Sequence, residues 1–235
     1  ITSCGTQKML KQYAKTVTHE FVTYGPEDCY SRSIQVHNEI VYTANSNGFI
    51  YSYDLTSKKA KKENMLPKPE LRDLYVYNDK FIIATQAAET SAVLSVYREV
   101  ESADQLSSKP TFIDAMDINS VGYGILMGDP VDGVFQVFTT VDKGITWTQV
   151  FDGLEAENGE AGFAASGSVV QVLREDIYLF ASGGKKSHLY KSNNYGKTWT
   201  KKEIPFTNSE SSGAFSILFS DENNGIAMGG DYLKP

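Results

Sequence analysis

The chain has 235 residues, of which 41% are hydrophobic, 12% aromatic and 22% charged. This composition is typical of a globular protein that buries a large core without a disulfide scaffold. The formal net charge is −7, so the chain lacks the basic field that holds a nucleic-acid backbone, and nucleic acid is not an expected partner.

The chain begins with Ile-Thr-Ser-Cys, a tetrapeptide similar to the lipobox of bacterial lipoproteins, in which the cysteine is lipidated. On this interpretation Cys4 carries a lipid anchor, residues 1–16 are a signal remnant and tether, and residues 17–235 are a single domain. We then expect a location in the bacterial cell envelope, lipid-anchored and either periplasmic or associated with the outer membrane. If Cys4 is not acylated, a disulfide with Cys29 in an oxidising compartment is the alternative.

Pairs of strand-like runs follow in chain order, each with alternating apolar residues and a turn rich in Asn, Asp or Gly. The pairs begin near Ile40, Phe81, Ile125, Tyr178 and Ile226, at steps of 41, 44, 53 and 48 residues. This spacing matches the period of a four-stranded propeller blade, and a further apolar segment precedes each pair. The sequence therefore predicts an all-β propeller of four-stranded antiparallel blades, of which about four and a half are visible.

The last predicted blade stops after two strands. A propeller closes by pairing its last blade with its first, because an open ring would leave exposed strand edges. Either residues 18–25 supply a closing strand, or the sequence is truncated at its C-terminus and about two blades are missing, by analogy with common blade numbers. We expect the truncation.

The two tryptophans of the chain end two closely similar phrases, TTVDKGITW and KSNNYGKTW. Both follow the pattern Ser/Thr-x-Asp/Asn-x-Gly-x-Thr-Trp, which resembles the Asp-box of sialidase-type (BNR) repeat families. In this pattern the Asp or Asn accepts hydrogen bonds from the turn backbone, Gly supplies a positive φ, and Trp packs between sheets. The predicted structural residues are Asp142, Gly144, Trp147, Asn194, Gly196 and Trp199.

Residues 110–235 carry further distinctive phrases, among them GYGILMGDPVDGVFQVFTT, GEAGFAASGS and SSGAFSILFSDENNGIAMGGDYLKP. In this order they resemble the photosystem II stability/assembly factor-like propellers of non-photosynthetic bacteria. The resemblance implies a propeller that binds an envelope or membrane protein and acts as an assembly scaffold. The dense arginine patch with which photosynthetic members hold a reaction-centre subunit is missing, so that activity is not carried over.

The distinctive loops are predicted to open on one face of the propeller. They are residues 128–133, 158–167, 182–188, 208–216 and 229–232. The starts of the inner strands should surround the channel mouth with Ser33, Asp73, Asp114, Ser166 and Ser216. The candidate binding residues of this face are Asp73, Asp114, Asp129, Asp132, Glu160, Ser166, Asp231 and Tyr232.

An acidic, hydroxyl-rich mouth suits a cation, a sugar or a basic peptide segment. Structural roles are an equal alternative, since carboxylates in such positions often cap turns or bond to neighbouring strands. No cofactor is expected, and calcium is the one ion left open. The histidines are scattered, with no His or Cys at zinc-ligand spacing: His19, His37 and His188.

Enzyme classes find little support in the sequence. A sialidase-type enzyme would need three arginines around a carboxylate, and the chain has only Arg32, Arg72, Arg98 and Arg174, of which Arg98 and Arg174 lie in outer or mid-strand contexts. A glycosidase needs two carboxylates at a defined separation, and nothing in the sequence selects such a pair. We predict a non-catalytic scaffold that binds a protein through the loop-rich face. The alternative is glycan binding or sialidase-like glycoside hydrolysis at the same mouth.

Overall fold

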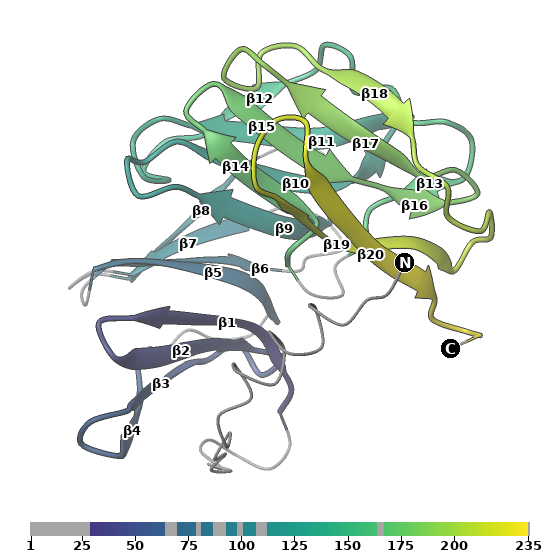
Figure 1. Cartoon of the computed structure of the whole chain (residues 1–235). Coiled ribbons are helices and arrows are strands. Elements are labelled where there is room, and N and C mark those ends of the chain that lie inside the picture. The colour runs from purple at the N-terminus through teal and green to yellow at the C-terminus, as the bar shows by residue number, and fades with distance from the viewer. Residues whose placement is uncertain are drawn as a thin grey trace, which may run out of the picture.

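The computed structural model describes residues 29–63, 70–78, 81–86, 93–97, 101–106, 112–163 and 167–234. These residues form β-strands, with no helix among them and so none that could cross a membrane (Figure 1). The strands form five four-stranded sheets, and the first four of these follow one another along the chain. The predicted all-β class and the four-stranded antiparallel sheets are thus confirmed, and the arrangement is consistent with propeller blades.

The first two sheets take their strands in chain order. The first consists of β1 (Ser31–His37), β2 (Ile40–Asn45), β3 (Ile50–Asp54) and β4 (Lys59–Lys62). The second consists of β5 (Leu71–Asn78), β6 (Phe81–Gln86), β7 (Val93–Tyr97) and β8 (Glu101–Gln105). All neighbouring strands in them are antiparallel.

The third and fourth sheets repeat this up-and-down order. The third consists of β9 (Ile113–Ile118), β10 (Gly124–Val131), β11 (Val134–Thr140) and β12 (Thr148–Val150). The fourth consists of β14 (Val170–Arg174), β15 (Ile177–Ala181), β17 (His188–Ser192) and β18 (Thr200–Glu203).

The fifth sheet is built differently. Its hairpin of β19 (Ser212–Phe219) and β20 (Gly225–Asp231) is extended by β16 (Gly183–Gly184) and β13 (Glu160–Ala161), in the order β13-β16-β19-β20. The two short strands come from segments predicted as loops. They can approach β19 because Gly183 and Gly213 face each other, and a Cβ on Gly213 would lie 2.4 Å from the Gly183 Cα.

The innermost strands of the sheets contact one another in turn, β1 with β5, β5 with β9, β9 with β14 and β14 with β19. Figure 1 shows the sheets fanning out from this series. Apolar side chains fill the space between consecutive sheets. The largest cluster lies between the third and fourth sheets and includes Phe135, Phe180, Tyr190 and Trp199.

The first tryptophan turn joins β11 to β12. Asp142 Oδ1 accepts a hydrogen bond from the Thr146 backbone N at 2.8 Å, and Trp147 Nε1 donates to the Gly144 carbonyl at 3.1 Å. Gly144 has a φ of 77°, a conformation that favours glycine. Trp147 is partly buried against the cluster between the second and third sheets.

The second tryptophan turn, between β17 and β18, has the same bonds. Asn194 Oδ1 accepts from the Thr198 backbone N at 3.0 Å, and Trp199 Nε1 donates to the Gly196 carbonyl at 2.9 Å. Gly196 has a φ of 75°. The two similar phrases therefore form two equivalent hairpin turns, each of which places a tryptophan beside the preceding sheet.

Two predicted loops are largely strand. β10 continues through a bulge at residues 128–130 to Val131, and only Asp132 and Gly133 form the turn, both with positive φ. This is the backbone of a tight two-residue hairpin, which needs fewer residues than the predicted loop. Likewise β20 extends to Asp231, so that Tyr232 is the first residue beyond it.

Candidate functional site

Asp73 links three consecutive sheets from its position in β5. Its Oδ1 accepts hydrogen bonds from the Ser33 hydroxyl at 2.6 Å and the Leu74 backbone N at 2.8 Å, and its Oδ2 accepts from the Met116 backbone N at 2.8 Å. Burial raises the pKa of Asp73 to about 7, although these hydrogen bonds oppose the shift. Asp73 therefore holds inner strands together in this structure.

Similar polar contacts join other inner strands. Asp117 accepts from the Val172 backbone N at 2.6 Å, and burial raises the pKa of this carboxyl. Gln171 exchanges two hydrogen bonds with the Phe219 backbone, at 2.7 and 3.0 Å. Asp117 is absent from the predicted site residues for two reasons. It lies within an apolar strand, and it comes three residues after Asp114, the residue that the strand alignment placed at the channel mouth.

Ser33 and Ser216 also join inner strands. Ser33 donates to Asp73, and the Ser216 hydroxyl bonds to Ser168 at 2.9 Å. Ser166, the other predicted hydroxyl of the mouth, lies outside the described residues, as do Cys4, Arg98 and His19.

Asp114 and Asp129 converge on the backbone of Gly162. Asp129 Oδ1 accepts from the Gly162 N at 2.9 Å, and a Cβ on Gly162 would lie 2.2 Å from Asp114 Oδ2. Asp114 is only 2% exposed, and its Oδ2 has no hydrogen-bond partner among the described residues. Burial and the charge of Asp129 raise the pKa of Asp114 well above its usual range, whereas the Arg72 charge lowers it. Burial also raises the pKa of Asp129.

Arg32 and Arg72, near the starts of β1 and β5, interact with neighbouring side chains. The Arg72 guanidinium lies over the Phe112 ring at 4.9 Å, and its Nη1 is 3.7 Å from Glu70 Oε1. Arg32 pairs with the same Glu70 oxygen. A sialidase-like arrangement, with three arginines free to hold a ligand carboxylate, is not formed by the described residues.

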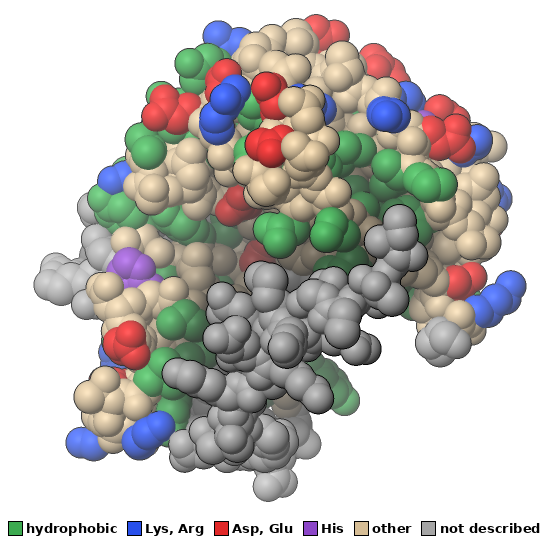
Figure 2. All heavy atoms as spheres, in the orientation of Figure 1, with side chains coloured by type: hydrophobic (Ala, Val, Ile, Leu, Met, Phe, Trp, Pro, Cys, Tyr) green, Lys and Arg blue, Asp and Glu red, His purple; other side chains and the backbone are tan. Residues whose placement is uncertain are grey.

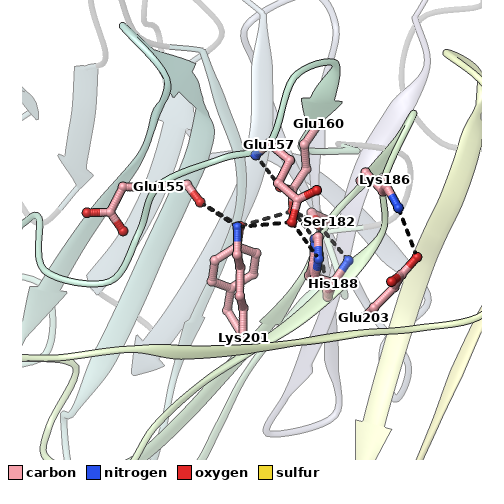
Figure 3. Close-up of polar contacts among 9 residues, drawn as sticks. Glu155, Glu157, Glu160, Ser182, Lys186, His188, Lys201 and Glu203 are labelled. Atoms are coloured by element: carbon pink, nitrogen blue, oxygen red, sulfur yellow. Dashed lines mark hydrogen bonds and ion pairs between the residues drawn. The ribbon is translucent and has the colours of Figure 1, made fainter.

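Glu160 lies at the centre of a buried polar network (Figure 3). Its Oε1 accepts from Tyr190 OH and from His188 Nδ1, each at 3.0 Å, and from the Ser182 hydroxyl. Its Oε2 accepts from the Glu157 backbone N at 2.8 Å. The side chain is 0% exposed, so both carboxylate oxygens stabilise the fold through these hydrogen bonds.

His188 completes this network on its outer side. Its Nε2 lies 3.3 Å from Glu157 Oε1, which is also 3.6 Å from Lys201 Nζ (Figure 3). The His188 ring is buried, and it lies between Glu157 and Glu160. Ser182, His188 and Glu160 do not form a catalytic triad, since the Ser182 hydroxyl bonds to Glu160 and each ring nitrogen faces a carboxylate.

Tyr232 and Asp231 lie at the end of β20, where Tyr232 forms a cluster with two phenylalanine side chains. The rings of Phe163 and Phe215 are 5.7 Å apart, and those of Phe163 and Tyr232 are 6.1 Å apart. Tyr232 is 58% exposed. Asp231 accepts from the Ser211 hydroxyl, which is the main cause of its lowered pKa.

One segment connects these groups. Glu160 enters the buried network, Gly162 lies against Asp114 and Asp129, and Phe163 packs against the Tyr232 ring. Asp132 is the exception, because it is exposed at the tip of the β10–β11 turn. Of the predicted residues, Asp73, Asp114 and Glu160 are buried.

Replacing Asp73 with asparagine is expected to flatten the pH dependence of stability between about pH 4 and 7. In this window the unfolded carboxyl releases its proton while the folded one, with its raised pKa, retains it, so wild-type stability falls as pH rises. For Asp73→Asn, the unfolding free energy should therefore fall less steeply with pH than for the wild type. The difference in slope corresponds to about one proton, or about 1.4 kcal/mol per pH unit. Urea denaturation across this range measures both slopes, and equal slopes would contradict the expectation.

No family model and no curated protein matches the chain. Among solved structures, the extracellular domain of the putative hybrid two component system BT4673 from B. thetaiotaomicron aligns with a TM-score of 0.60 and 15% identity over 91% of this chain. A second structure of this domain, described as a putative one component system, has a TM-score of 0.59 and 14% identity over 89%. The chain spans only 28% and 27% of these two structures.

A structure of YCF48 bound to D1 peptide has a TM-score of 0.48 and 10% identity, covering 90% of this chain and 80% of that one. At such identities the BT4673 likeness concerns the fold alone. Function has to be argued from the residues of the site.

Proposed function

We propose that this chain is a non-catalytic β-propeller of the Asp-box type that binds a partner protein or scaffolds a complex in the bacterial envelope. The consecutive contacts between inner strands and the two equivalent tryptophan turns support the propeller architecture. The lipobox-like start of the chain supports lipid anchoring at Cys4. The resemblance of residues 110–235 to assembly-factor-like propellers supports the scaffold role.

The observation that carries the binding role is the aromatic cluster of Phe163, Phe215 and Tyr232. Three separate segments supply its rings, and Tyr232 exposes most of its surface. Aromatic residues with a polar tip are enriched in the centre of protein interfaces. Asp231 beside the cluster, together with the net charge of −7, favours a partner segment that carries basic residues.

The geometry gives little support to a hydrolase. Asp114 has the raised pKa of a general acid, but it is buried against the Gly162 backbone, where no glycosidic bond could reach it. Glu160 already accepts hydrogen bonds from four groups. A hydrolase would need two carboxylates that can contact one bond.

Replacing Tyr232 with alanine is expected to reduce partner recovery at least about tenfold, as for a central aromatic interface residue. The experiment is a pull-down from a solubilised membrane fraction of the source cells, with the tagged chain as bait and mass spectrometry as readout. Tyr195→Ala is the matched control. Tyr195 is also exposed, but it lies in the tryptophan turn that follows β17 and does not belong to the aromatic cluster. Equal recovery by the Tyr232 and Tyr195 variants would contradict the proposal.

Glycan binding at the same cluster is the second candidate. An exposed tyrosine ring beside the Asp231 carboxylate and the Ser209 and Ser211 hydroxyls also suits a sugar ring and its hydroxyl groups. A glycan array probed with the wild type and Tyr232→Ala separates the two. Tyr232-dependent glycan binding without a recovered protein would favour the lectin-like function.

A further inference from the structure

Asparagine followed by glycine is a chemically labile pair, because the glycine backbone N can attack the side-chain amide before it. Glycine has no side chain to hinder this approach. The attack needs a free backbone N and an asparagine side chain that can turn toward it, so local structure decides which pairs react. The chain contains three such pairs: Asn47-Gly48, Asn158-Gly159 and Asn224-Gly225.

The first pair, in the turn between β2 and β3, is held by hydrogen bonds. The Gly48 backbone N donates to the Asn45 carbonyl at 3.0 Å. Asn47 Oδ1 accepts from the Phe49 backbone N at 3.2 Å. Gly48 is also buried, so this turn has to open before the reaction can start.

The third pair, at the start of β20, has a restrained side chain. Asn224 Nδ2 donates to both carboxylate oxygens of Asp221, at 2.9 and 3.0 Å. The Asn224 backbone N donates to the same carboxylate at 3.0 Å. The nitrogen that would leave as ammonia is therefore held by two hydrogen bonds.

The second pair has neither kind of restraint. Asn158 and Gly159 are both exposed, in a turn closed by the hydrogen bond from the Glu160 backbone N to the Glu157 carbonyl at 3.0 Å. Among the described residues, neither the Gly159 backbone N nor the Asn158 side chain has a hydrogen-bond partner. Both reacting groups are thus free.

The fold also requires the glycine that makes this pair labile. Gly159 has a φ of 79°, as the third residue of a type II turn does, and this conformation favours glycine. A Cβ at Gly159 would lie 2.7 Å from the Lys185 side chain. A larger residue would slow the attack, but the turn does not accommodate one.

We propose that Asn158 is a site of spontaneous deamidation and isomerisation. The Gly159 backbone N attacks Asn158 Cγ, so that a new C–N bond forms and the bond from Cγ to the side-chain nitrogen breaks. This nitrogen leaves as ammonia together with the proton of the Gly159 amide, and a succinimide ring remains. Water then opens the ring at either carbonyl, which leaves aspartate or isoaspartate at position 158.

The products form beside the Glu160 network (Figure 3). The Glu157 backbone N donates to Glu160 Oε2 at 2.8 Å, and the Gly159 carbonyl accepts from the Lys185 backbone N at 2.8 Å. The second bond lies next to the pairing of β13 with β16. Isoaspartate adds a methylene to the backbone between these bonds, so the turn cannot keep its geometry and Glu160 loses part of its support.

The added carboxylate should matter less than the longer backbone. Figure 2 shows Lys and Arg side chains interspersed with Asp and Glu over the fourth sheet. Asn158 is exposed, and water screens the charge of an exposed group. We therefore expect the isoaspartate form to lose stability and the aspartate form to keep it.

The test is peptide mapping by mass spectrometry while the 235-residue chain is incubated in warm, mildly alkaline buffer. Asn158 should convert at least about fivefold faster than Asn47 or Asn224, because no hydrogen bond has to open first. These two asparagines are matched controls within the same molecule. In urea, the three rates should converge. No conversion at Asn158, equal rates in the folded protein, or a ranking that persists in urea would each overturn the proposal.

The effect on the fold is measured on the aged forms, separated by ion exchange. In urea denaturation, the isoaspartate form should unfold at a lower urea concentration than the unaged protein, whereas Asn158→Asp should unfold like it. Asn158→Gln, which has a longer side chain, should keep its midpoint on ageing. An unchanged midpoint of the isoaspartate form would overturn the connection to the Glu160 network. None of these measurements involves a partner, so they do not depend on the proposed binding function.

Discussion

Replacing Glu160 with alanine is expected to destabilise the protein by about 3–5 kcal/mol, as when one partner of a buried ionic network is removed. The substitution leaves His188 Nδ1 without its Glu160 acceptor, and it leaves the Ser182 and Tyr190 hydroxyls only their longer bonds to the His188 carbonyl at 3.4 Å and the Glu155 carbonyl at 3.3 Å. Each buried donor left unpaired costs free energy, because it has lost water as well as its partner. Urea denaturation with linear extrapolation measures the loss.

Glu157→Ala is the matched control for this network. Glu157 also faces His188, at 3.3 Å, but its side chain is 45% exposed. Exposed ion pairs contribute little, so we expect a loss below about 1 kcal/mol. If the Glu160 and Glu157 variants lose equal stability, the four hydrogen bonds of Glu160 do not stabilise the fold as described.

Replacing Trp199 with alanine is expected to cost about 3–5 kcal/mol, the usual range for a buried aromatic residue. Trp199 is 5% exposed and contacts the Phe180 ring at a centroid distance of 5.2 Å in the largest core cluster. Its indole also donates to the Gly196 carbonyl, so the variant loses a turn contact together with the packing. Thermal denaturation followed by circular dichroism measures the change.

Trp147→Ala separates packing from turn geometry. Trp147 makes the same indole hydrogen bond in its turn but is only partly buried, beside a smaller cluster. We expect its loss to be clearly smaller than that of Trp199→Ala. Equal losses would mean that the turn bond, common to both, dominates the effect.

Sequence patterns predicted most of the architecture because its determinants are local. Alternating apolar residues set the strands, and the repeat of the segments around Ile40, Ile125 and Tyr178 set the sheets. The tryptophan phrases specified their turns through residues close in sequence. In both turns the Asp or Asn, the Gly and the Trp contact groups within four residues.

The candidate site was less predictable because its contacts are long-range. Glu160 has its partners 22, 28 and 30 residues farther along the chain, at Ser182, His188 and Tyr190. The two-residue strands β13 and β16 are too short to show any periodicity. The aligned strand starts and loops singled out these carboxylates, but they could not show that Glu160 and Asp114 are buried.

The polar contacts between inner strands have a mechanical consequence. Asp73, Asp117 and Gln171 each accept a hydrogen bond from a backbone N–H of the next sheet, so each of these bonds joins two consecutive sheets. Load then passes through the molecule in series, and each sheet depends mainly on those beside it, as in stacked repeats. Under tension or proteolytic attack, rupture at one junction among the first four sheets would release whole sheets as units, whereas the fourth and fifth sheets would separate together because their strands alternate along the chain.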